Sequence, residues 1–381
     1  MTLPIRRVRA DGGVDDVGVY DRARRVLVLT GPGYPLRQAG EYVVDGDLPW
    51  MLQEMAPGGY MGRRFAQSFP ELGVPKDPRL WRVEDTLHAL TQRGEDLPGN
   101  LLIGDESHAR LLARAHLTMD LPEVDDLLAG AASSSLLSGR GLSSVLEARV
   151  ESLVQESLAS PRSSSSVGGD RPKFLLPRVI LKFSPTKGTP FAERWSDLLS
   201  IESHCLATLR AAGIAAASAV VVDGERRRFL AVQRFDRVGV AGRRGAATWF
   251  WLDAQLYGTG DAALCAQRLR ADGTLTADEL DRFQVVHAFS AATGNTDTHL
   301  GNYGLVFDDD GGAHLSPFYD VVPMAFAPRH DELPDAYIVS ASRSPEPRVH
   351  ALVGQLAARV EEDPLITAEF KIKWMKYIGH P

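Results

Sequence analysis

A short polar segment in the C-terminal half of the chain carries the residue types that phosphoryl transfer needs. Asp297 and Asn302 stand five residues apart within residues 295–302, and Asp320 follows in a later segment. Protein kinases space a catalytic Asp and a metal-binding Asn by the same interval, and a second Asp further along completes their magnesium site. Magnesium prefers oxygen ligands, so one carboxylate and one amide suffice when ATP phosphates add to them. The spacing therefore predicts a site for ATP and Mg²⁺, with Asp297 orienting the acceptor hydroxyl.

A lysine upstream is a candidate for contact with the phosphates of the nucleotide. Lys182 ends the apolar run Val-Ile-Leu-Lys, where a strand would place its ammonium on the α- and β-phosphates. Residues 163–169 are rich in Ser and Gly, and they can offer backbone N–H groups to phosphate. On the following helix, Glu202 is the expected ion-pair partner of Lys182, with Glu193 and Asp197 as competing candidates.

Two histidines, His299 and His314, lie near these residues in the sequence. We interpret them as supporting hydrogen-bond groups, because nothing else nearby completes a zinc-type ligand set. Two other functions stay open. In a metal-dependent phosphoesterase or nuclease, Asp297, His299 and Asp320 would bind a metal directly, and in a nucleotide-binding regulator the site would bind ATP with little catalysis. The Lys182 strand and the loop before it speak against the phosphoesterase, because simple hydrolysis has no use for them.

The pattern of apolar residues predicts the elements that position these groups. Loop, strand, helix and hairpin follow one another in the order of a kinase small lobe. The expected elements are a strand at 26–29, a helix at 145–158, a strand at 179–183, a helix at 191–212 and a hairpin of 219–222 with 229–232. Further on, Thr276 and Glu279 form a capping box that opens a helix ending near residue 292. Strands at 303–307 and 313–315 then flank an Asp- and Gly-rich turn.

Length and composition describe an ordinary globular protein. With 381 residues, 44% hydrophobic and 24% charged, the chain is expected to form two or three domains. Its net charge of −7 gives no general reason to bind nucleic acid. The most apolar run, residues 211–222, is far shorter than the roughly 20 residues of a membrane-spanning helix. Cys205 and Cys265 lack metal-ligand spacing, which indicates a reducing compartment, so we expect a cytoplasmic protein without membrane insertion.

Around the Asp297 segment, the sequence resembles the HipA family of bacterial serine/threonine kinases, which are toxins of type II toxin–antitoxin modules. The resemblance extends from about residue 163 to residue 326. Residues 294–302 look like the catalytic loop of that family, and residues 316–320 look like its metal-binding segment. The resemblance implies ATP and Mg²⁺ as cofactors, Asp297 as the catalytic residue, and Asn302 and Asp320 as metal ligands.

The same resemblance implies further contacts with ATP. Lys182 would contact the nucleotide, and His299 is counted with the ATP-binding residues. The segment around Gln233 and Phe235 is similar to the connection between the two lobes, where backbone groups of these two residues would meet the adenine.

A loop of the family carries an autophosphorylated serine, and residues 163–169 resemble it. Ser166, Val167, Gly168 and Gly169 would contact ATP, and Ser166 is the aligned phosphorylation site, with the three serines before it as alternatives. In the family this modification silences the enzyme. A phosphate carries roughly −1.5 to −2 charge and would be repelled from a site built to hold ATP.

The N-terminal part, especially residues 48–55 and 97–105, resembles the YjjJ (HipH) branch of the family. Members of that branch often start with a helix-turn-helix, and no such segment precedes Val8, so direct DNA binding is not expected. The family implies a protein substrate, such as an aminoacyl-tRNA synthetase or another translation component, and an antitoxin protein as a partner.

These observations together predict an α+β fold, in which a two-lobed protein-kinase-like domain of the HipA type follows an N-terminal accessory domain. The expected domains are an accessory domain at 1–140, a small lobe with the Ser/Gly phosphate loop at 141–240, and a mostly helical large lobe with the catalytic loop at 241–381. Residues beyond about 345 match no part of the family.

Overall fold

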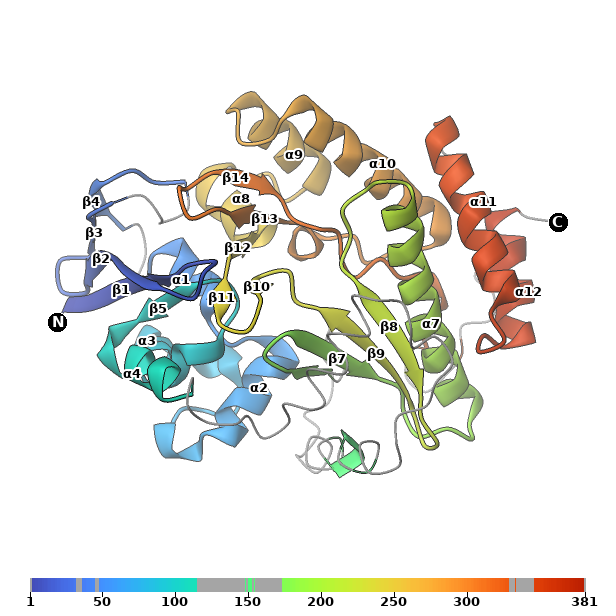
Figure 1. The fold of residues 1–381 in the computed structure, drawn as a ribbon, viewed down its shortest axis with the longest axis horizontal. Helices are drawn as coiled ribbons and strands as arrows, with labels where there is room; N and C mark the ends of the chain where they lie inside the picture. Colours follow the sequence, from blue (N-terminus) through green and yellow to red (C-terminus); the bar gives the residue numbers. More distant parts are fainter. Residues whose placement is uncertain are drawn as a thin grey trace. The chain divides into compact units, whose positions relative to one another are not determined.

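A computed structural model describes residues 2–31, 36–44, 48–114, 173–328 and 346–379, with single positions or short pieces at 148, 150–152, 154 and 333. The chain divides into two compact units that are interleaved along the sequence (Figure 1). The first unit contains Met1–Pro122, Phe235–Leu275 and Tyr303–Ser316. The second contains Glu123–Arg234, Thr276–Asn302 and Pro317–Pro381.

The first unit is built on a five-stranded antiparallel sheet in the order β4-β3-β2-β1-β5. Alternating burial along the strands, as at Leu3 and Ile5, packs one face of this sheet into the core. The strand expected at 26–29 is confirmed as β3. The strands are β1 (Thr2–Val8), β2 (Val14–Asp21), β3 (Val26–Leu29), β4 (Gly40–Val43) and β5 (Leu101–Ile103).

Helices and two small sheets complete the first unit. The hairpin predicted around the Asp- and Gly-rich turn is confirmed as β13 and β14, which pair antiparallel. The helices are α1 (Trp50–Met55), α2 (Gly59–Ser68), α3 (Val83–Arg93), α4 (Gly104–Arg114), α8 (Trp249–Leu256) and α9 (Ala262–Ala271), with short 3-10 turns at Pro70–Leu72, Pro78–Leu80 and Gly94–Asp96. The small sheets join β10 (Arg237–Val238) with β11 (Gly242–Arg243), and β12 (Gly245–Thr248) with β13 (Gly304–Phe307) and β14 (Ala313–Leu315).

The second unit contains a four-stranded antiparallel sheet in the order β6-β7-β9-β8. A long helix, α7 (Pro190–Ala211), packs against β8 and β9 (Figure 1). Thr189 starts α7, because its hydroxyl accepts the N–H of Ala192 and Pro190 presets the first turn. The strand, helix and hairpin expected here are confirmed. The strands are β6 (Lys173–Leu175), β7 (Val179–Phe183), β8 (Ala219–Asp223) and β9 (Arg228–Gln233).

The described part of the second unit also contains the helices α10 (Ala277–Thr293), α11 (Pro347–Glu362) and α12 (Ala368–Ile378), with short 3-10 turns at Leu300–Asn302 and Met324–Phe326. The predicted capping box is confirmed, since Thr276 and Glu279 exchange side-chain and backbone hydrogen bonds. Gly294, with a φ of 92°, ends α10 in the left-handed conformation that glycine adopts without strain. The residues beyond 345 pack on this framework through Trp374, which is fully buried and donates its indole N–H to the Thr293 carbonyl at 3.0 Å.

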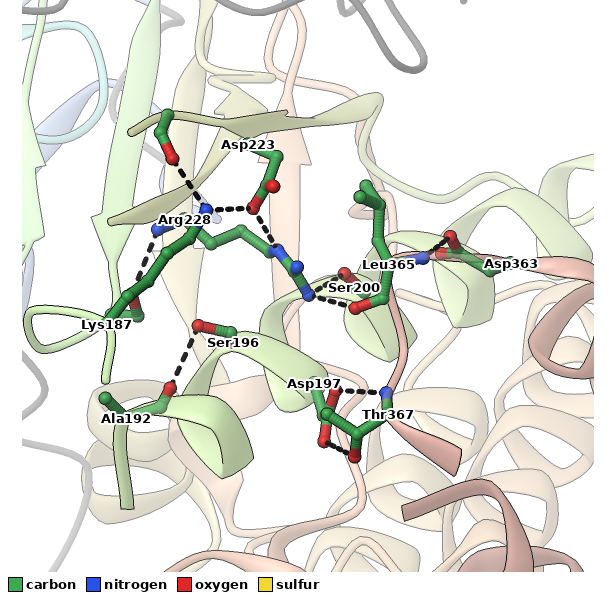
Figure 2. Close-up of polar contacts among 12 residues, drawn as sticks. Lys187, Ala192, Ser196, Asp197, Ser200, Asp223, Arg228, Asp363, Leu365 and Thr367 are labelled. Atoms are coloured by element: carbon green, nitrogen blue, oxygen red, sulfur yellow. Dashed lines mark hydrogen bonds and ion pairs between the residues drawn. The ribbon is translucent and has the colours of Figure 1, made fainter. Parts of the chain in front are cut away.

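The connection between α11 and α12 is fastened to the sheet through Arg228 (Figure 2). The buried guanidinium of Arg228 donates to Asp223 at 2.8 Å, to the Ser200 hydroxyl at 3.2 Å and to the Leu365 carbonyl at 2.6 Å. One side chain therefore joins the β8–β9 hairpin, helix α7 and the α11–α12 connection.

A second fastening point lies one helical turn earlier on α7. Asp197 accepts the backbone N–H of Thr367 at 2.9 Å and its hydroxyl at 2.6 Å (Figure 2). We call the contacts of Arg228 and Asp197 together the α7 latch.

Among the described residues, no helix is both long and apolar enough to cross a membrane.

Candidate active site

Lys182 lies at the centre of a buried ionic cluster in the second unit. Strand β7 carries it to within 2.6 Å of Glu202 on α7, measured between Nζ and Oε1. The same ammonium contacts Oδ1 of Asp320. Lys182 is 9% exposed and Glu202 is fully buried. Of the three carboxylates considered for Lys182, Glu202 makes the ion pair, whereas Glu193 is exposed and Asp197 belongs to the α7 latch.

The charge of Lys182 is maintained by its two carboxylate neighbours. Burial alone favours the neutral amine, but the charges and hydrogen bonds of Asp320 and Glu202 outweigh it and raise the pKa of Lys182 above its ordinary value. The side chain is therefore an ammonium at neutral pH. It is a fixed positive charge in a poorly solvated place, which is what binding a phosphate requires.

Asp320 is held in an uncommon backbone conformation. Its φ of 52° lies in the left-handed region, which non-glycine residues seldom adopt and which is often found at functional sites. The segment before it is fixed by the Phe318 backbone, whose N–H donates to the Ala215 carbonyl at 2.9 Å and whose carbonyl accepts from Ala217 at 2.8 Å. These contacts fix the backbone two residues before Asp320.

The loop after α10 carries Asp297 and Asn302. Asn302 closes a 3-10 turn, Leu300–Asn302, with its backbone N–H on the His299 carbonyl at 2.9 Å. Its side-chain Nδ2 donates to the backbone carbonyl of Asp297. Because Nδ2 is engaged inside the loop, Oδ1 is the amide atom that can face a cation. The carboxylate of Asp297 is 31% exposed, so an acceptor group can reach it.

His299 stands beside Asp297 and is more than half exposed. Its Nδ1 accepts the Gly301 N–H at 3.0 Å, so a neutral ring carries its proton on Nε2. Nε2 lies 3.7 Å from Oδ1 of Asp297, too far for a good hydrogen bond but close enough for electrostatic contact. The arrangement suits a group that orients a neighbouring carboxylate or a phosphate.

Sequence reasoning gave no role to Asn295, although this residue lies between Asp297 and Asp320. Its Oδ1 accepts the N–H of Asp297 at 3.1 Å, and its Nδ2 donates to the carbonyl of Asp320 at 3.3 Å. The first contact is an Asx turn, for which an Asn two residues before Asp297 is a recognisable signal. The second contact joins positions far apart in the sequence and has no local signal.

The donor atoms at this place suit Mg²⁺. The carboxylate of Asp320 already receives a cationic group, the Lys182 ammonium, and Oδ1 of Asn302 is a hard oxygen donor. Magnesium commonly binds one or two such groups and completes its octahedron with phosphate and water. In the described part of the chain, no three His, Cys, Asp or Glu side chains gather into a group that could hold a metal ion.

The remaining residues expected at the site are placed as follows. Gln233 ends β9, where it pairs with Val179 of β7 and donates its N–H to the Ser218 carbonyl at 2.8 Å. Phe235 belongs to the first unit. The four residues of the phosphate loop, Ser166, Val167, Gly168 and Gly169, lie outside the described residues.

Two family models match the chain. One, described as a HipA-like C-terminal domain, matches residues 165–367, and the other, described as the middle domain of a YjjJ-like toxin, matches residues 1–112. The first covers more than half of the chain, and its range includes Lys182, Glu202, Asp297, Asn302 and Asp320. It extends to residue 367, so the expectation that residues beyond about 345 match no part of the family is wrong. The fold is thus a HipA-like kinase fold. The chain belongs to the HipA family, and its N-terminal part is similar to that of YjjJ-like toxins.

Individual relatives agree with this assignment. The chain is 29% identical to the toxin YjjJ of Escherichia coli (strain K12), over 94% of this chain and 80% of that protein. It is also similar to a chain in the solved complex of the Shewanella oneidensis MR-1 toxin–antitoxin system HipA and HipB with its operator DNA. That match has a TM-score of 0.62 and 16% identity, over 99% of this chain and 95% of the other. The predicted fold class, a HipA-like α+β fold with an N-terminal accessory domain, is confirmed.

Proposed function

We propose that this chain is a serine/threonine protein kinase that uses ATP and Mg²⁺. The observation that supports it best is the ionic cluster in which Lys182 joins Glu202 and Asp320. A lysine that pairs with a helix carboxylate and lies beside a metal-binding Asp is the arrangement that protein kinases use for nucleotide phosphates. Membership of the HipA family supports the same activity.

In this proposal, Lys182 binds the α- and β-phosphates while Glu202 fixes its direction. Asn302 and Asp320 would hold Mg²⁺, which neutralises charge on the phosphate oxygens when it is bound. When Asp320 binds a metal ion instead of Lys182, Lys182 keeps its positive charge, because Glu202 remains its ion-pair partner. Backbone groups near Gln233 and Phe235 are proposed for the adenine. Since the Gln233 N–H already serves the Ser218 carbonyl, the carbonyl of Gln233 is the better candidate.

Asp297 is proposed to receive the proton of the acceptor hydroxyl. The hydroxyl oxygen forms a bond to the γ-phosphorus while the bond from that phosphorus to the bridging oxygen breaks. Its electron pair leaves with ADP, and the hydroxyl proton passes to the Asp297 carboxylate. His299, whose Nε2 lies 3.7 Å from that carboxylate, would orient it and contact the phosphates.

Regulation and partners follow the family in this proposal. Ser166 is the proposed site of autophosphorylation, with the serines at 163–165 as alternatives, and modification there would silence the enzyme by like-charge repulsion. The proposed substrate is a protein of translation, such as an aminoacyl-tRNA synthetase. An antitoxin protein is the proposed partner, since the Shewanella oneidensis HipA is part of a complex with HipB.

Incubation of the purified protein with γ-labelled ATP and a bacterial lysate tests the proposal. We expect the label on serine or threonine of a small number of lysate proteins, dependent on Mg²⁺. ATP binding without any transfer would point to a nucleotide-binding regulator. Cleavage of nucleic acid in the absence of ATP would point to a metal-dependent nuclease. Either result would overturn the proposal that the chain is a kinase.

A further inference from the structure

We infer that Asn295 is a positioning residue that sets the direction of the Asp320 carboxylate toward Mg²⁺. The inference rests on the proposed kinase function and deepens it. Asn295 is 6% exposed and touches both segments of the proposed site. Both ends of its amide are engaged with backbone groups, one in each segment.

Asn295 joins the Asp297 loop to the backbone of Asp320, because its Nδ2 donates to the Asp320 carbonyl at 3.3 Å. The chain on either side of Asp320 is fixed by backbone bonds. Phe318 donates to the Ala215 carbonyl at 2.9 Å, and Ala325 donates to the Gly294 carbonyl at 2.9 Å. Between these anchors, Asp320 adopts its left-handed conformation, with a φ of 52°. A hydrogen bond to its carbonyl stabilises that conformation, because rotation of the peptide would break it.

The amide of Asn295 suits this place because it is a donor and an acceptor at once. An aspartate of the same shape keeps the acceptor for the Asp297 N–H but loses the donor for the Asp320 carbonyl. A serine is too short to bridge both segments. Because Asn295 is buried, a lost bond leaves a polar group with little water to replace it.

The test measures how the binding of a non-hydrolysable ATP analogue depends on Mg²⁺, by calorimetry, without reference to catalysis. In Asn295→Asp and Asn295→Ser we expect a rise of roughly 10- to 100-fold in the Mg²⁺ concentration that gives half of the maximal increase in analogue binding. Replacing other residues that orient metal ligands weakens metal binding by a similar factor. Binding of the analogue without Mg²⁺ should stay close to wild type, since it depends on Lys182. The added charge of the aspartate would by itself attract Mg²⁺, so a loss there must come from the missing donor.

Thr293→Val is the matched control, because the Thr293 hydroxyl bonds only to the Phe289 and Ser290 carbonyls of its own helix. Thermal unfolding establishes that each variant is folded. An unchanged Mg²⁺ requirement in folded Asn295→Asp and Asn295→Ser would overturn the inference and leave the kinase proposal standing. Wild-type protein that binds the analogue with no effect of Mg²⁺ would overturn the kinase proposal itself.

Discussion

At the scale of single residues, Lys182 is the group on which the proposed site depends most. It neutralises Glu202, which is fully buried, and Asp320. Replacement by methionine leaves a carboxylate in a poorly solvated place without a counter-ion, which costs on the order of 3 kcal/mol or more. We therefore expect Lys182→Met to lower the free energy of unfolding by about that amount and to abolish phosphate transfer. Urea unfolding measures the first effect, and a stability equal to wild type would contradict it.

The pH dependence of Lys182 follows from the direction of its pKa shift. The carboxylates outweigh burial and raise the pKa in the folded protein above the ordinary 10.5. The stability that the ammonium contributes is therefore fully present below about pH 10 and lost as the pH rises through the folded pKa. We expect the free energy of unfolding of the wild type to fall in strong alkali as Lys182 loses its proton, and to fall less in Lys182→Met, which has no such proton to lose. An equal fall in both proteins would contradict the assignment.

At the scale of elements, the α7 latch fixes the helix that presents Glu202. Thr367→Val removes the hydroxyl that bonds Asp197 at 2.6 Å and caps α12 by accepting the Phe370 N–H. We expect the free energy of unfolding to fall by about 2 kcal/mol, because one hydrogen bond to a carboxylate and one N-cap are removed. Phosphate transfer should fall as well, because α7 becomes free to shift Glu202 away from Lys182.

Ser196→Ala is the matched control for Thr367→Val. Ser196 lies beside Asp197 on α7, but its hydroxyl bonds only to the Ala192 carbonyl of the same helix, at 2.9 Å (Figure 2). Its removal should cost less than about 1 kcal/mol and leave transfer unchanged. Equal losses of stability and of phosphate transfer in both variants would show that the α7 latch does not hold α7 in place.

Helix α1 and strand β12 of the first unit are joined by a titratable contact. Glu54 accepts the Thr248 hydroxyl at 2.8 Å, and burial raises the pKa of Glu54 to about 7. A raised pKa means that the folded protein holds the proton of Glu54 more tightly than the unfolded chain does. The protonated side chain therefore stabilises the fold, and this contribution is fully present below about pH 4.5 and lost as the pH rises through 7. Glu54→Gln, which cannot ionise, should match wild type near pH 4 and exceed it by about 1–3 kcal/mol near pH 8. Urea unfolding at both pH values measures this, and a wild type more stable at pH 8 would contradict it.

At the scale of the whole molecule, local patterns of the sequence predicted several of the elements. The capping box at Thr276, the apolar run of β7 and the turn between β13 and β14 each depend on a few neighbouring residues, and each element was found where expected. The sequence assigned no role to the C-terminal helices α11 and α12, because their contacts are with residues far away in the sequence. Trp374 caps the end of α10, and Leu365 and Thr367 hold Arg228 and α7.

The candidate site was predictable to a similar extent. Kinase-like spacing indicated Asp297, Asn302 and Asp320, and their roles stay a prediction. The sequence favoured Glu202 as the partner of Lys182 over Glu193 and Asp197, and the structure shows that it is Glu202 on the face of α7 that meets β7. Asn295 was missed because its contact with Asp320 forms only when two distant segments come together. The interleaving of the two compact units along the chain is likewise a property of the folded protein and has no local signal.

The most direct test of the central claim is phosphate transfer by wild type and by Asp297→Asn, with binding of a non-hydrolysable ATP analogue measured on the same samples. Asparagine keeps the shape and the backbone contacts of Asp297 but cannot take up the acceptor proton. We predict that wild type transfers the γ-phosphate of ATP to protein hydroxyls, and that Asp297→Asn binds the analogue nearly as well but transfers at least about 100-fold more slowly. Transfer at the wild-type rate by Asp297→Asn, or none by wild type that binds the analogue, would contradict the account.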